Sequence, residues 1–391
     1  MGDVAARHIV ADSVAGEQDD RPPEQGTVGG ETRPLRIAMI APPWFELPPT
    51  GYGGIESMVA DLVDTLADTG HEVMLIGAGR HRTSAARFVA VYDTPPSERL
   101  GTPVPEVLHA ARAAAALREL DVDVVHDHSL AAPLLAAGRG TPTVVTMHGP
   151  VDGELGDYFA ALGEAVGVVA ISAAQQALRP ELNWVGTVHN AIDVASFPFR
   201  ARKGEPVLWL GRFSPDKGAH LAIDAARTAG LPIVLAGKRN EPDEHAYFDR
   251  EIAPRLGPGV SYVGEADAAR KRELFAEARA LVFPIQWEEP FGIVMIEALA
   301  CGTPVVALRR GSVPEVITHG RSGLVVDHPA QLAEALRAAE RLDPIQCRRE
   351  AETRFNLPVM AGGYERIYRA AIRQRATGPA APATEGRRSV A

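Results

Sequence analysis

Cysteine is scarce in this sequence of 391 residues, where it occurs only as Cys301 and Cys347. Two thiols supply neither a disulfide framework nor a cysteine-based zinc site. The sequence has no run of about 18 apolar residues, which a membrane-spanning helix requires, and no apolar signal core at its beginning. We therefore expect a cytoplasmic protein without a membrane span, and leave peripheral association with a membrane surface open.

Basic charge is outnumbered by acidic charge. The sequence has 40 Lys and Arg residues against 50 Asp and Glu residues, which gives a net charge of −10. Nucleic-acid-binding proteins usually carry a basic field, so no nucleic-acid partner is expected. Because 46% of the residues are hydrophobic, the chain can bury substantial cores. Its length suits two domains better than one.

Common catalytic motifs are missing as well. The sequence has no Gly-x-Ser-x-Gly elbow and no P-loop. Gly51, Gly53 and Gly54 lack the Gly-x-Gly-x-x-Gly spacing of a dinucleotide-binding turn. This argues against a nicotinamide-dependent dehydrogenase.

What the sequence does contain is a regular alternation of short β-branched runs with Ala- and Leu-rich stretches, typical of parallel sheets covered by helices. In the first half, strands are expected at Arg36–Ile40, Glu72–Ile76, Val122–His126, Thr143–Met147 and Val166–Ile171, and helices at Ser57–Thr69, Pro105–Leu120 and Leu130–Ala137. In the second half, strands are expected at Pro206–Leu210, Ile233–Ala236, Val260–Val263, Ala280–Phe283, Pro304–Ala307 and Gly323–Val326, with helices such as His220–Thr228 and Arg270–Ala278.

The two series predict two doubly wound, Rossmann-like α/β domains over residues 35–199 and 200–358. Residues 1–34 and 377–391 are polar or rich in Ala, Pro and Arg, and are expected to be disordered tails. A ligand would bind in the cleft at the carboxyl ends of the strands.

The segment Gln286–Glu297 is the most informative part of the sequence. It places Glu297 within an apolar run that predicts a buried helix, about two turns from its start, where a carboxylate without a partner is costly. Before the run, Glu289, Pro290 and Gly292 predict a loop that opens onto a helix N-terminus, which favours an anion. A ligand with both phosphate and hydroxyl groups, such as a sugar nucleotide, would suit both features. The alternative is a helix whose glutamate extends to water.

Two glycine-containing loops follow predicted strands. In Gly211–Gly218, Arg212 and Lys217 are suited to phosphate oxygens, although a solvated turn with two surface cations is the alternative. In Pro48–Glu56, glycines would allow a ligand to approach the backbone closely, but the loop could equally be structural.

Histidines end two neighbouring strands. His126-Asp127-His128 ends one, and His148 ends the next. A metal site formed by these four residues is an alternative, but hydrogen bonding to a sugar or to backbone is the favoured role for His148. For His126 and His128, packing within the core is equally plausible. Other polar strand ends are Ser172, Asn190–Asp193, Gly237-Lys238 and Gly311–Glu315.

Taken together, these residues resemble family 4 glycosyltransferases (glycosyltransferase group 1), which are retaining enzymes of the GT-B fold. The resemblance extends from about Leu35 to Ala371. Its most specific part is Glu289-Pro-Phe-Gly, four further residues and Glu297, followed by Ala298–Ala307. It is supported by Gly211-Arg212 with Lys217-Gly218, by Gly53–Glu56 and by Thr146–His148.

The resemblance implies that residues 200–358 bind a nucleotide-diphosphate sugar as donor substrate, without a cofactor or a metal. Arg212 and Lys217 would hold the diphosphate, Glu297 the ribose and Glu289 the donor sugar. His148 would lie near the reacting centre and act with Arg212, Lys217 and Glu289. The donor would also meet Gly53, Gly54, Gly237, Phe291, Gly292, Ile293 and Val294.

The family's reaction would move a hexose to a hydroxyl of a small-molecule, glycan or lipid acceptor by front-face attack. The acceptor would bind on the side of residues 35–199, and a helix within 359–376, centred on Met360–Arg373, would cross back to that domain. A UDP-sugar is the favoured donor. Guanosine and adenosine nucleotides stay open, because the choice of base depends on the backbone and packing around Lys238, Val263 and Gly264.

One departure from the family pattern is Ala191, which stands where an Asn-Gly-Ile/Val-Asp turn usually has Gly. The main alternative function is a non-catalytic nucleotide-sugar-binding protein. A glycosidase is disfavoured because two phosphate-binding cations would have no purpose there.

Overall fold

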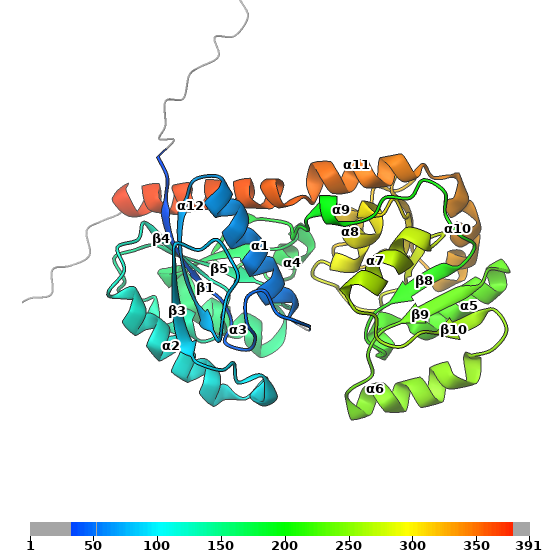
Figure 1. Ribbon diagram of the computed structural model, residues 1–391, viewed down its shortest axis with the longest axis horizontal. Coiled ribbons are helices and arrows are strands. Elements are labelled where there is room, and N and C mark those ends of the chain that lie inside the picture. The colour runs from blue at the N-terminus through cyan, green and yellow to red at the C-terminus, as the bar shows by residue number, and fades with distance from the viewer. Residues whose placement is uncertain (1–32, 52, 378–391) are drawn as a thin grey trace, which may run out of the picture. The chain divides into compact units, whose positions relative to one another are not determined.

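The computed structural model describes residues 33–51 and 53–377. Tyr52 and nearly all of the two predicted tails lie outside the described residues. Within them, the chain forms two separate parallel sheets, one from each half of the sequence (Figure 1). The expected α/β architecture is therefore confirmed.

The first sheet has seven strands in the order β3-β2-β1-β4-β5-β6-β7. Their bounds are β1 Arg36–Ile40, β2 Glu72–Ala78, β3 Arg87–Tyr92, β4 Val124–Asp127, β5 Thr143–Met147, β6 Gly167–Ala170 and β7 Trp184–Thr187. Five of these strands were expected and two, β3 and β7, were not. The register places Met39 of β1 beside His126 of β4, so the side chains that follow these strands lie near one another.

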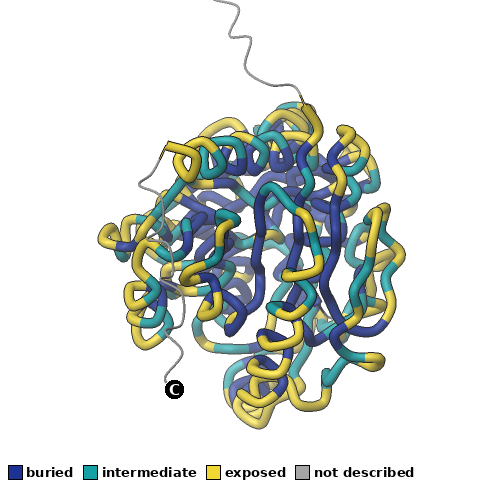
Figure 2. Tube along the Cα trace, turned by 90° about the vertical axis from the view of Figure 1, so that its left-hand side faces the viewer, coloured by how far each residue is buried: buried dark blue, intermediate teal, exposed yellow. Residues whose placement is uncertain are grey.

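Helices cover both faces of the first sheet: α1 Gly54–Asp68, α2 Pro103–Leu117, α3 Gly153–Leu162, α4 Ala173–Leu178 and α12 Leu357–Thr377. Ile37 and Met39 pack in a core with α1 and α12, whereas Ala38 and Ile40 pack in another with α2. Side chains alternate between the faces of a strand, which is why β1 serves both cores. Strands β1, β2, β4, β5 and β6 are buried along most of their length, whereas the edge strands β3 and β7 are not. The buried segments lie in the interior of the molecule (Figure 2).

The second sheet has six strands in the order β10-β9-β8-β11-β12-β13. These are β8 Val207–Leu210, β9 Ile233–Ala236, β10 Val260–Tyr262, β11 Leu281–Phe283, β12 Val305–Leu308 and β13 Gly323–Val326. The associated helices are α5 Ala219–Ala229, α6 Pro242–Tyr247, α7 Ala268–Glu277, α8 Ile293–Ala300, α9 Val313–Val316, α10 Leu332–Ala338 and α11 Pro344–Arg354. All six strands agree with the sequence prediction to within one residue at each end.

The last helix, α12, follows α11 of the second half but packs on the first sheet, beside α1. Its buried residues include Met360, Tyr364 and Tyr368. This is the arrangement that the family resemblance implied for Met360–Arg373. The domain bounds drawn from the sequence stay a prediction.

One expected helix is wrong. Leu130–Ala137 contains only a short 3-10 helix, Ala132–Leu135. Pro133 at its start and Gly138 just beyond the segment, where φ is positive, both oppose a longer α-helix.

Candidate active site

Glu297 lies inside α8, with only 6% of its side chain exposed. Its Oε1 accepts a hydrogen bond of 2.5 Å from Lys271 Nζ of α7. Its Oε2 is buried and has no partner among the described residues. Burial raises the pKa of Glu297, and the Lys271 ammonium opposes that shift. The predicted polar partner therefore exists, while the alternative of a glutamate extended to water is wrong.

The position of Glu297 along the helix also needs correction. It is the fifth residue of α8, which begins at Ile293. With about 3.6 residues per turn, this is little more than one turn from the N-terminus. Gly292 caps that end in a left-handed conformation (φ 71°), and no side chain caps it. Glu297 is thus nearer to the helix start than the sequence suggested.

Glu289 lies in the loop before α8 and pairs with Lys217. The distance from Lys217 Nζ to Glu289 Oε2 is 2.5 Å, and 18% and 12% of the two side chains are exposed. The ammonium also lies 5.0 Å from the ring centroid of Trp287. Lys217 belongs to the short 3-10 helix Pro215–Lys217 after β8. The fold thus brings together a cation and a carboxylate that are 72 residues apart.

The Glu289 loop is held by the start of α9. Ser312 donates its backbone N–H to the Glu289 carbonyl (3.0 Å) and its Oγ–H to the Phe291 carbonyl (2.7 Å). Gly311 N–H donates to Glu288 Oε2 at 2.6 Å. Phe291 is buried, whereas Ile293 and Val294 at the start of α8 are partly accessible. These hydrogen bonds hold the backbone of the loop in place. The Glu289 side chain remains available to pair with Lys217.

Arg212 is less tightly placed than Lys217. Half of its side chain is exposed (51%), and Nη1 lies 3.6 Å from Glu244 Oε1 of α6. Gly237, at the end of β9, has φ 154°, and a Cβ there would lie 1.7 Å from the Gly211 carbonyl oxygen. Only glycine permits this approach of the β8 and β9 loops.

Gly53 and Gly54 form the start of α1, where no side chain caps the helix. Gly53 has φ 142°, and a Cβ on it would lie 2.9 Å from Pro49 Cγ. Gly54 has open space around its Cα. The backbone at this helix start is thus open on one side, as expected for a close approach to a ligand.

His148 follows β5 and contacts His128, which follows β4. The distance from His148 Nε2 to His128 Nδ1 is 2.9 Å. Burial lowers the pKa of His148 to about 4. Both nitrogens of His126 are used within the core, Nδ1 with the Tyr368 hydroxyl (2.7 Å) and Nε2 with the Thr146 hydroxyl (2.8 Å). His126 is therefore a satisfied core residue.

No group of three potential metal ligands occurs within residues 33–51 and 53–377. One Asp-x-Asp sequence, Asp121-Val122-Asp123, lies before β4, at the opposite end of the strand from His128. Both of its carboxylates pair with Arg36. The histidine set therefore does not form the metal site considered from the sequence, and Asp121 and Asp123 are engaged by Arg36.

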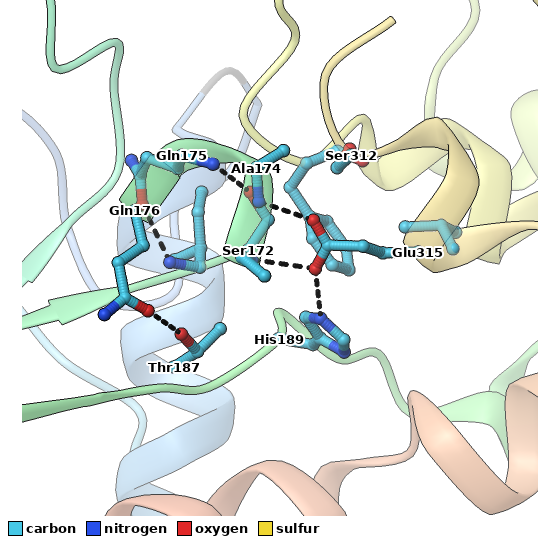
Figure 3. Close-up of polar contacts among 12 residues, drawn as sticks. Ser172, Ala174, Gln175, Gln176, Thr187, His189, Ser312 and Glu315 are labelled. Atoms are coloured by element: carbon cyan, nitrogen blue, oxygen red, sulfur yellow. Dashed lines mark hydrogen bonds and ion pairs between the residues drawn. The ribbon is translucent and has the colours of Figure 1, made fainter. Parts of the chain in front are cut away.

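Glu315 of α9 is a polar residue whose role the sequence did not indicate. Its carboxylate accepts hydrogen bonds from the backbone N–H groups of Ala173 (2.8 Å) and Ala174 (2.6 Å), at the start of α4 (Figure 3). It also lies 3.2 Å from His189 Nε2. Burial acts to raise its pKa, but these hydrogen bonds outweigh burial, so the pKa of Glu315 is lowered.

The next residue of α4, Gln175, extends this link to His148. Its side-chain amide donates to the carbonyl oxygens of Met147 (2.9 Å) and Gly149 (2.7 Å), on either side of His148. Ser312, which precedes α9, thus contacts the Glu289 loop, and Glu315 of α9 contacts α4. This chain of hydrogen bonds ties the His148 loop to the Glu289 loop. No local motif could have indicated its central contact, because Glu315 and Ala173 are 142 residues apart.

The two remaining residues named from the sequence are Ala191 and Cys301. Ala191 is buried (3% exposed) and packs in the core that contains α12. Cys301 is fully buried, and burial raises the pKa of its thiol to about 12. Cys301 is therefore a core residue.

With this geometry established, the chain can be compared with known proteins. Residues 196–354 match the model for glycosyl transferases group 1, and residues 52–196 match that for glycosyltransferase family 4. The phosphatidyl-myo-inositol mannosyltransferase of Mycolicibacterium smegmatis is 30% identical over 345 residues, 78% of this chain and 83% of the relative. The glycogen synthase of Mycobacterium tuberculosis is 27% identical over 422 residues, 90% of this chain and 99% of the relative.

Solved structures agree. AviGT4, a glycosyltransferase involved in avilamycin A biosynthesis, matches with a TM-score of 0.66 and 29% identity, over 87% of this chain and 98% of that chain. Sucrose-phosphate synthase from Thermosynechococcus elongatus has a TM-score of 0.71 at 20% identity, over 87% and 99%, and shows the fold alone.

The two sheets and the matches of their fold define a glycosyltransferase of the GT-B class. Within that class, the chain belongs to glycosyltransferase family 4. The expected fold, family and enzyme class are confirmed. Within the described residues, no helix has the length and apolar character needed to cross a membrane. The roles of individual site residues stay predictions.

Proposed function

We propose that the protein is a retaining hexosyltransferase that moves a hexose from a nucleotide-diphosphate sugar to an acceptor hydroxyl, without a metal ion. A UDP-sugar is the favoured donor. The observation that carries this proposal is the Lys217–Glu289 pair, 2.5 Å long, directly before the uncapped start of α8. It puts a cation, a hydroxyl-binding carboxylate and free helix N–H groups in one place.

Donor binding follows from the charges at this end of the second sheet. Lys217 and Arg212 would hold the diphosphate, with backbone N–H groups at Gly292–Val294 and at Gly53-Gly54. Glu297 would accept a hydrogen bond from a ribose hydroxyl at Oε2, which has no partner among the described residues. Lys271 pairs with this buried carboxylate through Oε1, which orients it. Gly237 lets the β9 loop reach the nucleotide.

The reaction breaks the bond between the anomeric carbon and the diphosphate oxygen. Negative charge then grows on the diphosphate, where Lys217, Arg212 and the α8 N-terminus stabilise it. The acceptor hydroxyl attacks from the same face and forms the new glycosidic bond, and its proton passes to a diphosphate oxygen. Neither Glu289 nor Glu297 then acts as a covalent nucleophile, unlike the carboxylate of a retaining glycosidase.

A thermal-shift screen of nucleoside diphosphates and their sugars tests the donor, because a ligand that binds only the native state raises its stability. We expect a nucleoside diphosphate to raise the melting temperature and its sugar to be hydrolysed slowly without acceptor, with retention at the anomeric carbon. Activity should persist in a chelator. Binding without any hydrolysis or transfer would instead support the nucleotide-sugar-binding alternative.

The acceptor is proposed as a small molecule, glycan or lipid bound on the side of the first sheet. We also propose that the protein is cytoplasmic and that it uses no cofactor. If no nucleoside diphosphate stabilises the protein, the proposed donor class is wrong, and with it the proposed hexosyltransferase reaction.

A further inference from the structure

Three side chains from neighbouring strands of the first sheet form one line of contacts. Met39 lies in β1, His128 follows β4 and His148 follows β5. His128 Nε2 lies 3.2 Å from Met39 Sδ, and His128 Nδ1 lies 2.9 Å from His148 Nε2. His128 is 5% exposed. Each nitrogen of the His128 ring therefore has one specific partner.

The chemistry of these partners indicates where the protons are. A thioether sulfur carries no hydrogen and can only accept, so His128 must present an N–H at Nε2. A neutral imidazole carries one N–H, so Nδ1 of His128 is a bare acceptor. The contact to His148 then requires that His148 Nε2 carries the hydrogen. By the same rule, Nδ1 of His148 is bare.

Both rings are neutral in this environment. Burial, with His126 and His148 nearby, lowers the pKa of His128 well below its ordinary value. The centroids of the His128 and His148 rings are 5.1 Å apart, with 27° between the ring planes. This separation exceeds the N···N distance by about the radii of two imidazole rings, so the rings meet edge to edge. That is the geometry of an in-plane N–H···N hydrogen bond.

The remaining nitrogen of His148 is the one available for chemistry. None of the described residues hydrogen-bonds to Nδ1, and this atom is not among the buried polar atoms that lack a partner. We propose that Met39 and His128 are positioning residues that fix the tautomer of His148, so that Nδ1 accepts a hydrogen bond from a hydroxyl of the transferred sugar. This rests on the proposed function, which puts His148 beside that sugar. His148 can then accept but not donate a proton at the reacting centre.

The tautomers can be measured directly on the ligand-free protein. In protein labelled with ¹⁵N-histidine, two-bond ¹⁵N–¹H correlation spectra distinguish a protonated ring nitrogen from a bare one. The chain has 12 histidines, so the signals of His128 and His148 are assigned by their loss in His128→Asn and His148→Asn. We expect both rings to carry hydrogen at Nε2 near pH 7. A hydrogen on Nδ1 of His148, or an imidazolium, would overturn the proposal.

Met39→Leu removes the sulfur acceptor and keeps the side-chain volume. We expect His148 to sample both tautomers and kcat to fall about 2- to 10-fold, the equivalent of one hydrogen bond. Nucleoside diphosphate affinity should be unchanged, because Met39 is not among the residues proposed to bind the nucleotide. Met74→Leu, a buried methionine of β2, is the matched control. Unchanged tautomers and unchanged kcat in Met39→Leu would overturn the proposal.

Substitutions of His128 separate hydrogen bonding from packing. In His128→Asn, the amide oxygen can replace Nδ1 as the acceptor for His148, whereas His128→Leu cannot accept. We expect the asparagine variant to keep the His148 tautomer and more of the turnover; equal losses in both variants would contradict the proposal. If no donor supports transfer by the wild type, the proposed function fails while the tautomer result still stands. If transfer occurs but Nδ1 is protonated, only this inference fails.

Discussion

The polar side chains at the strand ends of the two sheets differ in their charge. At the second sheet, Lys217 pairs with Glu289 and Lys271 with Glu297, both at 2.5 Å. At the first sheet the strand-end groups favour their uncharged forms instead, since burial lowers the pKa of His148 to about 4 and raises that of Asp127 to about 7. The second sheet is thus arranged for an anionic diphosphate and the first for uncharged hydroxyl groups.

The largest expected effect is on the ionic side. Lys217→Ala removes one cation of the proposed diphosphate site and leaves Glu289 without its partner. One lost charge-assisted contact costs roughly 1.5–3 kcal/mol, so turnover should fall at least about tenfold. Initial rates with a competent donor and acceptor measure this. Arg341→Ala, an exposed cation of the same half, is the control, and wild-type turnover in Lys217→Ala would remove the basis of the assignment.

Glu297→Ala should weaken nucleotide binding. It removes the oxygen proposed for the ribose and leaves Lys271 without its partner. The dissociation constant for the cognate nucleoside diphosphate, measured by calorimetry, should rise about tenfold, as expected for one hydrogen bond to a charged group. Glu273→Ala, on the exposed side of α7, is the control. An affinity equal to that of the wild type would exclude the ribose role.

These ionic residues also show what the sequence could predict. Arg212, Lys217, Glu289 and Glu297 stand in motifs with fixed spacing, and all six strands of the second sheet were found. Lys271 and Gln175 were missed, and Glu315 was named only as part of the polar strand end Gly311–Glu315, because their partners are distant in the sequence. Strand β7 (Trp184–Thr187) was missed because it is short, half-exposed and interrupted by Gly186, so its placement depends on pairing with β6 and packing against α12.

Glu315→Gln tests the link between the two sides. It removes a carboxylate that accepts two backbone N–H groups at the start of α4, so stability at pH 7 should fall by about 1–2 kcal/mol. The pKa of Glu315 is lowered on folding, so its contribution is present above the unfolded pKa of about 4.5 and is lost as pH falls below it. Chemical denaturation of wild type and variant at several pH values measures the difference.

Turnover should fall more than nucleotide affinity in Glu315→Gln, because the link orients the His148 loop through Gln175. Glu334→Gln, at an exposed position of α10, is the control for removing one charge. A stability loss that is the same at pH 4 and pH 7 would show that the carboxylate charge has no part in the link.

The last prediction concerns Asp127 at the first sheet. Here stability falls, rather than rises, as the pH increases. Asp127 is fully buried; its Oδ1 accepts hydrogen bonds from Ser129 N–H and Oγ–H, both 2.8 Å long, while Oδ2 has no partner among the described residues. Burial, opposed by these bonds, raises its pKa from 3.8 to about 7. The native state therefore binds the proton more tightly than the unfolded state, and stability falls as pH rises through this window.

Asp127→Asn keeps an acceptor for Ser129 but cannot become charged. Relative to the wild type, the variant should therefore gain stability as the pH rises from 5 to 8, because only the wild type has to lose a proton that its native state holds tightly. Urea denaturation at the two pH values measures this, with the exposed Asp93→Asn as control. A difference between variant and wild type that does not change with pH would mean that Asp127 is charged throughout. Asp127 would then not support the contrast between ion pairs at the second sheet and uncharged groups at the first.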